Sequence, residues 1–522
     1  MMDEKKQIHP ILGRFLENPP PPGAGGVPPQ LGIAPARQYE IDGKDRALLP
    51  LAVLLGVLLF EMVLNALTVP GLAVTTMVAA WYGVLFWYKG IEGLHSRPAL
   101  LIFLAVCLQA LTFVLFSSVW FRLWNLLTLP ALLGVQLFQW SGAARRPWTS
   151  PGMLWERLCL TLDGLFCRLG APLRAAVPRG EGRGRWVYVA LGLAVAVPVL
   201  FFVFPLLVSA DALFAQFTSG LVAFLNTNLR EWMVKLAVGL CLAPFLFSLL
   251  YALRRPEPLK EKAAHPHLTV DAALPVTLLV VMDGLYAVFL AVQFAGLFGG
   301  DRYLAATGIS YADYARSGFF QLVTVSVLNL ALVMACLQVS RREGRGWGWV
   351  RALSTGLVGA SVVMLASAAW KMTLYVTVYG LSFKRLLTYW GMVMLAIFFS
   401  AALAKIWREG FSFFKVFFTV GLAGWLVLNY MNVDLIVAKY NVSRYQSGAS
   451  AVMDLPYLAE LSYDTLGVLE ELPGDTQVYH GSTDYPLSRL VAERRDAARR
   501  DASRWQSWSL SAYLAARGQG EG

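Results

Sequence analysis

Apolar runs, each about 20 residues long, recur along most of this chain, and no other feature constrains its fold as strongly. A run of this length crosses the hydrocarbon core of a bilayer when it forms a helix. Hydrophobic residues make up 57% of the chain and charged residues only 15%, which is less charge than a soluble domain of this size carries. The sequence therefore predicts an all-α, polytopic helical membrane protein, with lipid covering most of its apolar surface.

Eleven of these runs are predicted to be transmembrane helices. They are 47–68, 70–88, 98–116, 119–139, 186–208, 231–253, 273–297, 317–339, 352–378, 385–404 and 412–430. Together they predict a transmembrane helical bundle over 47–430. The preceding segment, 1–46, contains PPPPGAGGVPP, which is typical of a linker, and we expect no cleaved signal peptide. The segment 431–522 is charged, lacks a spanning run and is predicted to be a small helical domain.

The positions of the basic residues predict the orientation of the bundle. Lys and Arg concentrate in every second connection between the predicted helices, which is the positive-inside pattern of cytoplasmic loops. This pattern places 1–46 in the cytoplasm as a Pro/Gly-rich tail and 431–522 outside as an extracytoplasmic helical tail. It also accounts for the net charge of +11 without a nucleic acid, and we expect no nucleic acid partner.

Two segments between the runs are not plain loops. Residues 152–177 place apolar residues at helical spacing, with Arg157 and Arg168 among them. This pattern predicts an amphipathic helix in the cytoplasmic interface, with arginines for anionic lipid, or else a helix packed on the bundle. Residues 209–229 are apolar but short, which favours a re-entrant or interfacial helix over a full span.

Four charged residues lie inside predicted spans, where a charge is costly. They are Glu61, Lys235, Asp283 and Lys371. Lys235 lies near the outer end of its span and can extend its amine to the interface, so it needs no functional explanation. Asp283 and Lys371 lie at different depths, and each has two interpretations. One is a structural polar contact, and the other is a site for a proton, a cation or a polar headgroup.

Candidate binding residues gather around the predicted span 273–297 and the outer ends of the spans that follow. They are Asp283, Tyr286, Tyr311, Asp313, Arg316, Lys371, Tyr375 and Lys384. Lys384 belongs to the tight turn Tyr379–Arg385. Its basic residues, together with Arg302 and Arg316, predict an outer patch for lipid phosphate or a cell-wall polymer, with ordinary headgroup anchoring as the alternative.

The usual signatures of enzymes and metal sites are absent from the sequence. It contains no Gly-rich phosphate loop ending in Lys-Ser or Lys-Thr, no HExxH and no GxSxG. The five cysteines are scattered, and the five histidines do not have the spacing of a metal site. We therefore predict no catalytic residue, no metal and no cofactor, which favours a protein that is not an enzyme.

Four stretches carry a family resemblance. They are Tyr311–Phe320 (YADYARSGFF), Leu374–Arg385 (LYVTVYGLSFKR), Asn432–Arg444 (NVDLIVAKYNVSR) with Asp454–Leu461 (DLPYLAEL), and Trp505–Leu510 (WQSWSL). In this order they resemble a bacterial multi-pass membrane family, domain of unknown function 4153/4173, over most of 186–510. The resemblance implies a multi-pass protein of the bacterial cytoplasmic membrane and brings no reaction or catalytic residue with it. The family often has Asn where Ser509 stands here.

Three functions are consistent with these observations. The first is a transporter or channel-like protein, with Asp283 and Lys371 lining a polar cavity, although no internal repeat typical of transporters is visible. The second is an envelope scaffold or sensor, whose outer loops and tail bind a protein or a cell-wall polymer. The third, a membrane enzyme acting on a lipid-linked substrate, ranks last because no motif supports it.

Overall fold

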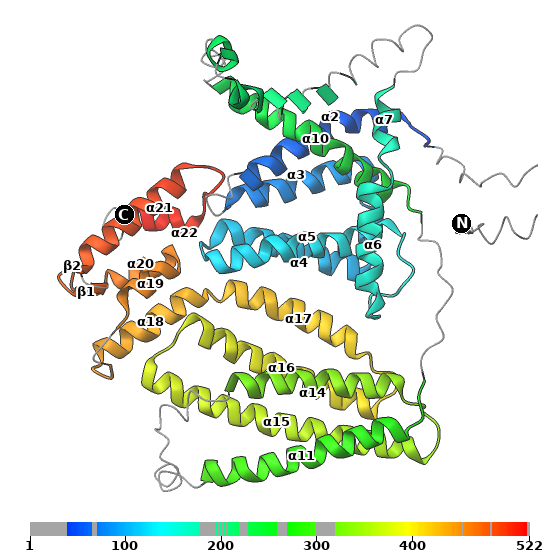
Figure 1. Cartoon of the computed structure of the whole chain (residues 1–522), viewed down its shortest axis with the longest axis vertical. Coiled ribbons are helices and arrows are strands. Elements are labelled where there is room, and N and C mark those ends of the chain that lie inside the picture. Colours follow the sequence, from blue (N-terminus) through cyan, green and yellow to red (C-terminus); the bar gives the residue numbers. More distant parts are fainter. Residues whose placement is uncertain are drawn as a thin grey trace, which may run out of the picture. The chain divides into compact units, whose positions relative to one another are not determined.

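The computed structural model describes residues 39–64, 70–177, 192–218, 228–257, 269–298, 319–450, 453–480 and 483–518, apart from short gaps at 193–194, 197–198, 201–202, 205 and 212. The chain divides into two compact units, Met1–Ile41 and Asp42–Gly522. All the elements below belong to the second unit, which is almost entirely helical, as the sequence predicts (Figure 1).

The long helices follow the predicted apolar runs. They are α2 (Gly43–Leu64), α3 (Leu72–Lys89), α4 (Arg97–Leu115), α5 (Val119–Ser141), α10 (Asn228–Arg254), α11 (Ala273–Phe298), α14 (Phe319–Val339), α15 (Arg345–Tyr379), α16 (Phe383–Trp407) and α17 (Phe413–Tyr430). Shorter helical elements connect or follow them. They are η2 (Glu92–His95), α6 (Gly152–Phe166), α7 (Gly170–Ala176), α18 (Val433–Gln446), α19 (Leu455–Leu461), η3 (Tyr463–Thr465), α20 (Leu466–Leu469), α21 (Leu487–Ser503) and α22 (Leu510–Arg517).

Among the residues that the structure describes, eight helices are long and apolar enough to cross a membrane. They are α4, α5, α10, α11, α14, α15, α16 and α17, and each coincides with a predicted span. Two further predicted spans, 47–68 and 70–88, correspond to α2 and α3. The predicted elements 186–208 and 209–229 are only partly covered by the described residues. The polytopic helical class is thus confirmed, and the number of eleven spans stays a prediction.

Helices α2 and α10 pack along one another, with Gly56 against Gly239 (Figure 1). A Cβ atom at Gly56 would lie only 2.5 Å from the carbonyl oxygen of Gly239. Small residues at such contacts let two membrane helices approach closely enough for their backbones to touch. The glycine pair therefore fixes the distance between α2 and α10.

The same helix pair contains a buried ion pair, in which Lys235 of α10 bonds Glu61 of α2. The side chains are only 12% and 8% exposed, and Gln506 of the tail donates a hydrogen bond to Glu61 at 3.1 Å. The interpretation that Lys235 needs only the interface is therefore wrong. Its amine is held by a carboxylate inside the protein, because the pair neutralises two charges that would each be costly alone.

A second charged cluster joins the opposite ends of these helices. The carboxylate of Asp45, at the start of α2, is fully buried. It accepts hydrogen bonds from Arg254 at 3.0 Å, from Arg255 at 3.1 Å and from the hydroxyl of Tyr88. The guanidinium of Arg254 also stacks on the ring of Tyr88. The cluster thus ties α2, α3 and α10 together at this end.

Helix α6 packs one face against α5 and α10 and leaves an apolar stripe uncovered. Met153, Arg157 and Leu160 are buried, whereas Trp155 and Leu158 are exposed. Packing on the bundle, one of the two interpretations of 152–177, therefore holds for the buried face. The exposed apolar stripe fits the other interpretation, and the position of this stripe in a membrane interface stays a prediction.

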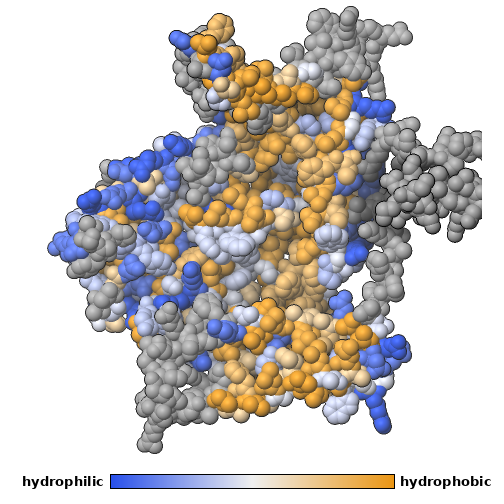
Figure 2. All heavy atoms as spheres, viewed as in Figure 1, coloured by the Kyte–Doolittle hydropathy of each residue, from blue (hydrophilic) through white to orange (hydrophobic). Residues whose placement is uncertain are grey.

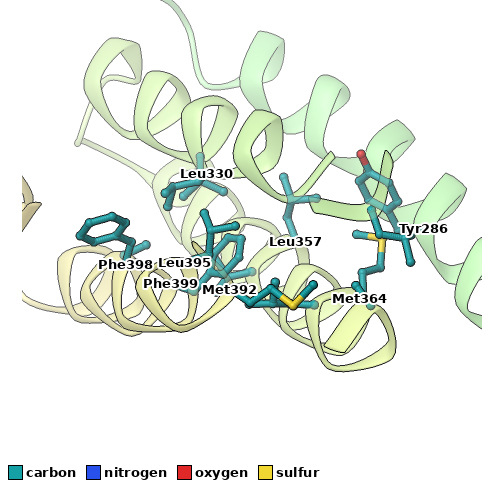
Figure 3. Close-up of a cluster of buried hydrophobic side chains, with 14 of the residues drawn as sticks. Tyr286, Leu330, Leu357, Met364, Met392, Leu395, Phe398 and Phe399 are labelled. Carbon is teal, nitrogen blue, oxygen red and sulfur yellow. The ribbon is translucent and has the colours of Figure 1, made fainter. Parts of the chain in front are cut away.

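Helices α11, α14, α15 and α16 form a second group around their own apolar core. Figure 3 shows Leu357 and Met364 of α15 beside Met392 and Phe399 of α16, with Tyr286 of α11 at the edge. Long, unbranched methionines and aromatic rings fill the space between four helices whose outer faces remain apolar. The α15 helix is the centre of this group, because it packs against α11, α14 and α16.

The tail, residues 431–518, packs around a core built mainly from α18 to α21, to which Phe121, Phe383 and Leu428 of the long helices also contribute. A small hairpin interrupts its helices, formed by β1 (Gln477–His480) and β2 (Thr483–Pro486) in antiparallel register. The sequence analysis missed this hairpin. Two four-residue strands separated by Gly481-Ser482 are a recognised hairpin signal. The tail was predicted to be helical throughout, and the hairpin was therefore not predicted.

The tail docks on one end of the long helices, which we call the tail side. The backbone N–H of Gly71, just before α3, donates to the carbonyl of Gln506 at 2.7 Å. The hydroxyls of Ser117, in the α4–α5 turn, and Ser511 are 2.9 Å apart. Figure 2 shows hydrophobic side chains over the long helices and hydrophilic side chains over α21 and α22. The polar surface is thus concentrated where the tail covers the helix ends.

Candidate functional site

A pocket of about 290 Å³ lies on the tail side, between the α15–α16 turn and the helices α18 and α19. From the turn it is lined by Tyr379, Gly380, Leu381, Ser382 and Arg385, and from the tail by Asn441, Arg444, Ser450, Met453, Asp454, Tyr457 and Leu458. Two of the four stretches that carry the family resemblance meet here: Leu374–Arg385, and Asn432–Arg444 with Asp454–Leu461.

The α15–α16 turn is hydrogen-bonded to side chains of the tail. Gly380 ends α15 with a φ of +76°, which favours glycine, and a side chain there would overlap the amide of Asn441. The Asn441 side chain accepts from the N–H of Leu381 at 3.2 Å and donates to the carbonyl of Leu381 at 2.7 Å. At the start of α16, the N–H of Phe383 donates to the hydroxyl of Tyr457 at 2.8 Å. Side chains of the tail thus satisfy N–H and carbonyl groups of the turn that would otherwise need backbone partners.

Two arginines bind the last turn of α15. Arg444 donates to the carbonyls of Val376 at 2.9 Å and Thr377 at 2.7 Å. Arg385 donates through Nη1 to the carbonyls of Tyr379, at 3.1 Å, and Gly380. Carbonyls at the end of a helix attract cations, because the helix dipole places partial negative charge there. These contacts fix both guanidinium groups at the wall of the pocket.

Both arginines keep donors that α15 does not use. A guanidinium has five N–H groups, and within the described part of the chain Arg385 donates through Nη1, which leaves its Nε and Nη2 groups for a ligand. Within the described residues, no carboxylate lies within ion-pair distance of Arg385 or Arg444. Asp454 also lines the pocket, but its Oδ1 accepts the N–H of Tyr457 and caps α19. The pocket therefore carries an excess of positive charge.

Two of the predicted site residues lie next to this pocket. The guanidinium of Arg385 stacks over the ring of Tyr375, 4.2 Å from its centroid. The ring centroids of Tyr375 and Tyr379 are 4.8 Å apart with the planes tilted by 55°, and Tyr379 lines the pocket. Lys384 is exposed at the first turn of α16 and does not line the pocket. Arg385 belongs to the basic turn for which the sequence predicts an outer patch, whereas Arg444 is not among the predicted site residues, and the role of all of these residues stays a prediction.

The other described candidates lie within the membrane helices. Asp283 packs against Gly356 of α15, where its Oδ2 is 3.2 Å from the position that a Cβ would take. The hydroxyl of Tyr286 donates to Asn329 at 2.8 Å, and Asn329 donates to Ser361 at 2.9 Å, which links α11, α14 and α15. This chain of buried hydrogen bonds gives Tyr286 a structural role.

The structure does not bring Asp283 and Lys371 together. Lys371 is buried on α15, 15 residues after Gly356. That separation corresponds to roughly 22 Å along the helix axis at 1.5 Å per residue. The two residues would therefore belong to two different sites. Tyr311, Asp313 and Arg316, like Arg302, lie outside the described residues.

A second group of polar side chains, which the sequence analysis did not single out, joins α5 to α4 and α17. Gln109 donates to Asn125 at 3.0 Å, Asn125 donates to Asn429 at 2.7 Å, and the indole of Trp425 donates to Asn125 at 3.0 Å. Three amides inside predicted spans were the available signal, because polar side chains at this depth commonly bond across helices. Each of these side chains has a partner, so the group is a structural joint.

A cavity of about 10 Å³ adjoins this joint and is lined by Arg122 and Asp434 among others. It offers space for about one water molecule. Asp434 is only 2% exposed, and its Oδ2 has no hydrogen-bond partner among the described residues. Burial raises the pKa of Asp434 to about 6. This cavity is too small for a ligand, so the α15–α16 pocket is the better candidate site of the two.

Comparison with known proteins adds one finding about the chain. The model of a domain of unknown function, DUF4153, matches residues 103–472. The matched range contains the α15–α16 turn, α18 and α19, and so every residue that lines the pocket. No curated protein and no solved structure matches the chain.

Proposed function

Since this chain belongs to the DUF4153 family, a family of unknown function, we propose a function from the site itself: an integral membrane protein that binds an acidic ligand in the α15–α16 pocket. This proposal is the hypothesis of an envelope scaffold or sensor, with the α15–α16 pocket as its binding surface. The observation that carries the proposal is the presence of Arg385 and Arg444 at one pocket, with no carboxylate partner among the described residues. Guanidinium groups held in this way recognise carboxylate and phosphate groups through paired hydrogen bonds.

The position of the pocket supports binding in preference to transport. Its walls come from a turn between two membrane helices and from two tail helices, so a ligand would contact both parts at once. In this proposal the protein lies in a bacterial cytoplasmic membrane with its tail side outward, because the basic connections mark the cytoplasmic side. The ligand then belongs to the cell envelope. In the same orientation the exposed face of α6 lies on the cytoplasmic side, where we expect it to contact anionic lipid.

The first test replaces both arginines. We expect the Arg385→Gln/Arg444→Gln double variant to bind inorganic phosphate or glycerol phosphate at least tenfold more weakly than the natural protein. The reason is that hydrogen bonds to a charged group contribute about 1.5–3 kcal/mol each, roughly ten- to a hundred-fold in affinity. Titration calorimetry of the purified full-length protein in detergent measures the change.

The matched control is Arg489→Gln, because Arg489 is an exposed tail arginine that pairs with Glu493 at 3.0 Å, lies over the ring of Tyr485 and does not line the pocket. It should bind like the natural protein. Since Arg385 and Arg444 also hold the end of α15, size-exclusion profiles must confirm that the double variant is folded. Ser382→Trp provides a second variant, which fills the pocket and keeps both arginines. Equal affinity in all of these folded proteins would refute the proposed site.

Transport remains a second candidate because of one observation. The Oδ1 atom of Asp283 is buried and has no hydrogen-bond partner among the described residues. An ionisable group without a partner in an apolar helix is a functional candidate for a proton or cation site. A hydrated route to this residue would support transport.

Solvent access to position 283 tests the transport candidate. In a variant whose five cysteines are replaced, Asp283→Cys should react with a membrane-impermeant thiol reagent if water reaches the site. We expect no reaction, because Asp283 packs against Gly356 and lines neither pocket described above. Labelling of a folded protein, in intact or permeabilised cells, would contradict this expectation and make transport the leading function.

A further inference from the structure

The α15–α16 pocket also indicates which acidic ligand it takes. Resting on the proposed function, we propose that the ligand is a phosphate ester in the headgroup of a glycerophospholipid, whose acyl chains stay in the bilayer. The binding chemistry of a phosphate is the same in a lipid and in a free ester. The depth, the lining and the size of the pocket favour the lipid.

The depth of the pocket follows from the two helices that bound it. One candidate span ends at Tyr379 and the next begins at Phe383, so only three residues separate them. A turn this short lies where the hydrocarbon region ends and the headgroups begin. The exposed ring of Tyr379, at the end of α15, has the position of an interfacial aromatic residue. A lipid phosphate is thus at the same level as the arginines.

The lining of the pocket matches the chemistry of a headgroup. Arg385 and Arg444 offer N–H donors to phosphate oxygens, and Asn441 lies beside them. Leu381, Met453 and Leu458 supply apolar walls, which suit the glyceryl carbons and the first atoms of the ester chains. A purely ionic ligand would not need these apolar walls.

The size of the pocket sets a limit on what enters. A volume of about 290 Å³ lies at the lower end of the range of small-molecule sites, roughly 300–1,000 Å³. A phosphate with a small substituent fits such a volume, whereas two acyl chains do not. The lipid must therefore leave its chains in the surrounding bilayer.

The guanidinium of Arg385 is ordered before any ligand arrives. The ring of Tyr375 lies 4.2 Å beneath it, and the carbonyls of Tyr379 and Gly380 hold its Nη1 group. A group that is already fixed loses little conformational freedom on binding, so more of the interaction remains as affinity. The exposed amine of Lys384, on the same turn, adds attraction for an anionic headgroup.

Three ligands separate the lipid from the free phosphate. The probes are short-chain phosphatidylglycerol, soluble glycerol phosphate and diacylglycerol, each titrated into the delipidated full-length protein in detergent, with bound lipid counted by native mass spectrometry. We expect phosphatidylglycerol to bind at least tenfold more tightly than either of the others. This preference should be lost in the Arg385→Gln/Arg444→Gln and Ser382→Trp variants and kept in Arg489→Gln.

Each other outcome overturns a defined part of the argument. If glycerol phosphate binds as tightly as phosphatidylglycerol and both depend on the arginines, the lipid source is wrong and the proposed function stands. If diacylglycerol equals phosphatidylglycerol, or if the arginine variants bind phosphatidylglycerol normally, phosphate recognition in this pocket is wrong. If the folded natural protein binds none of the three probes, both this inference and the proposed acidic-ligand site are rejected.

Discussion

The Gly56→Leu variant is expected to lose most of its folded protein, because the side chain has no space between α2 and α10. A Cβ atom at Gly56 would lie 2.5 Å from the carbonyl oxygen of Gly239 and 3.0 Å from its Cα. In the reverse direction, a Cβ at Gly239 would lie 3.0 Å from the backbone nitrogen of Val57. These contacts involve backbone atoms, which cannot rotate away as a side chain can. The two helices would have to separate.

We expect the substitution to lower the free energy of unfolding by about 3 kcal/mol, the upper end of the range for overpacked cores. The value is high because the separation also strains the Glu61–Lys235 and Asp45 contacts. Thermal unfolding followed by size exclusion in detergent measures it. Gly359→Leu is the matched control, since Gly359 also lies in a membrane helix and a Cβ there meets nothing within 4 Å. A Gly56→Leu variant as stable as the Gly359→Leu variant would show that the observed packing of α2 on α10 is not required.

The second large effect is expected from Lys235→Met. This change removes the cation that bonds the carboxylate of Glu61, whose side chain is only 8% exposed. Breaking one partner of a buried ion pair costs about 3–5 kcal/mol, because the remaining charge is left without compensation. Gln506 of the tail bonds the same carboxylate, so the segment around Trp508 should also become more sensitive to protease. Thermal unfolding and limited proteolysis measure both effects.

The double variant Glu61→Leu/Lys235→Met separates the charge from the packing. Removing both partners eliminates the buried charge, and apolar replacements of similar volume are often as stable as the pair itself. We therefore expect the double variant to recover most of the stability that Lys235→Met loses. If the double variant is as unstable as the single one, the contribution of Lys235 is packing, and the explanation by unpaired charge is wrong.

The sequence predicts the membrane helices well where an apolar run ends at a turn. The run 412–430 corresponds to α17 (Phe413–Tyr430), because the turns at its two ends interrupt both the apolar run and the helix. The run 352–378 corresponds to a longer helix, α15, which starts at Arg345. The extra turns contain Arg345 and Arg351, and charged residues continue a helix beyond the part that hydropathy can detect.

Contacts between residues that are distant in the chain could not be predicted from the sequence. Glu61 and Lys235 were both recognised as costly charges, but a single sequence does not show that they form a pair. Arg385 and Arg444 each belong to a stretch that carries the family resemblance, and only the folded tail brings them to one pocket. The family itself was predicted correctly from these stretches, since the model of DUF4153 matches 103–472.

The length of α15 has a mechanical consequence. Its 35 residues extend for about 52 Å, whereas the hydrocarbon core of a bilayer is about 30 Å thick. The helix is therefore longer than the hydrocarbon core is thick, and its two ends carry the pocket at Tyr379 and the basic turn before Arg345. A tilt imposed at one tip moves the other without any hinge between them. Membrane thickness influences the tilt of such a long helix, so a thicker or thinner bilayer is expected to act on the end that carries the pocket.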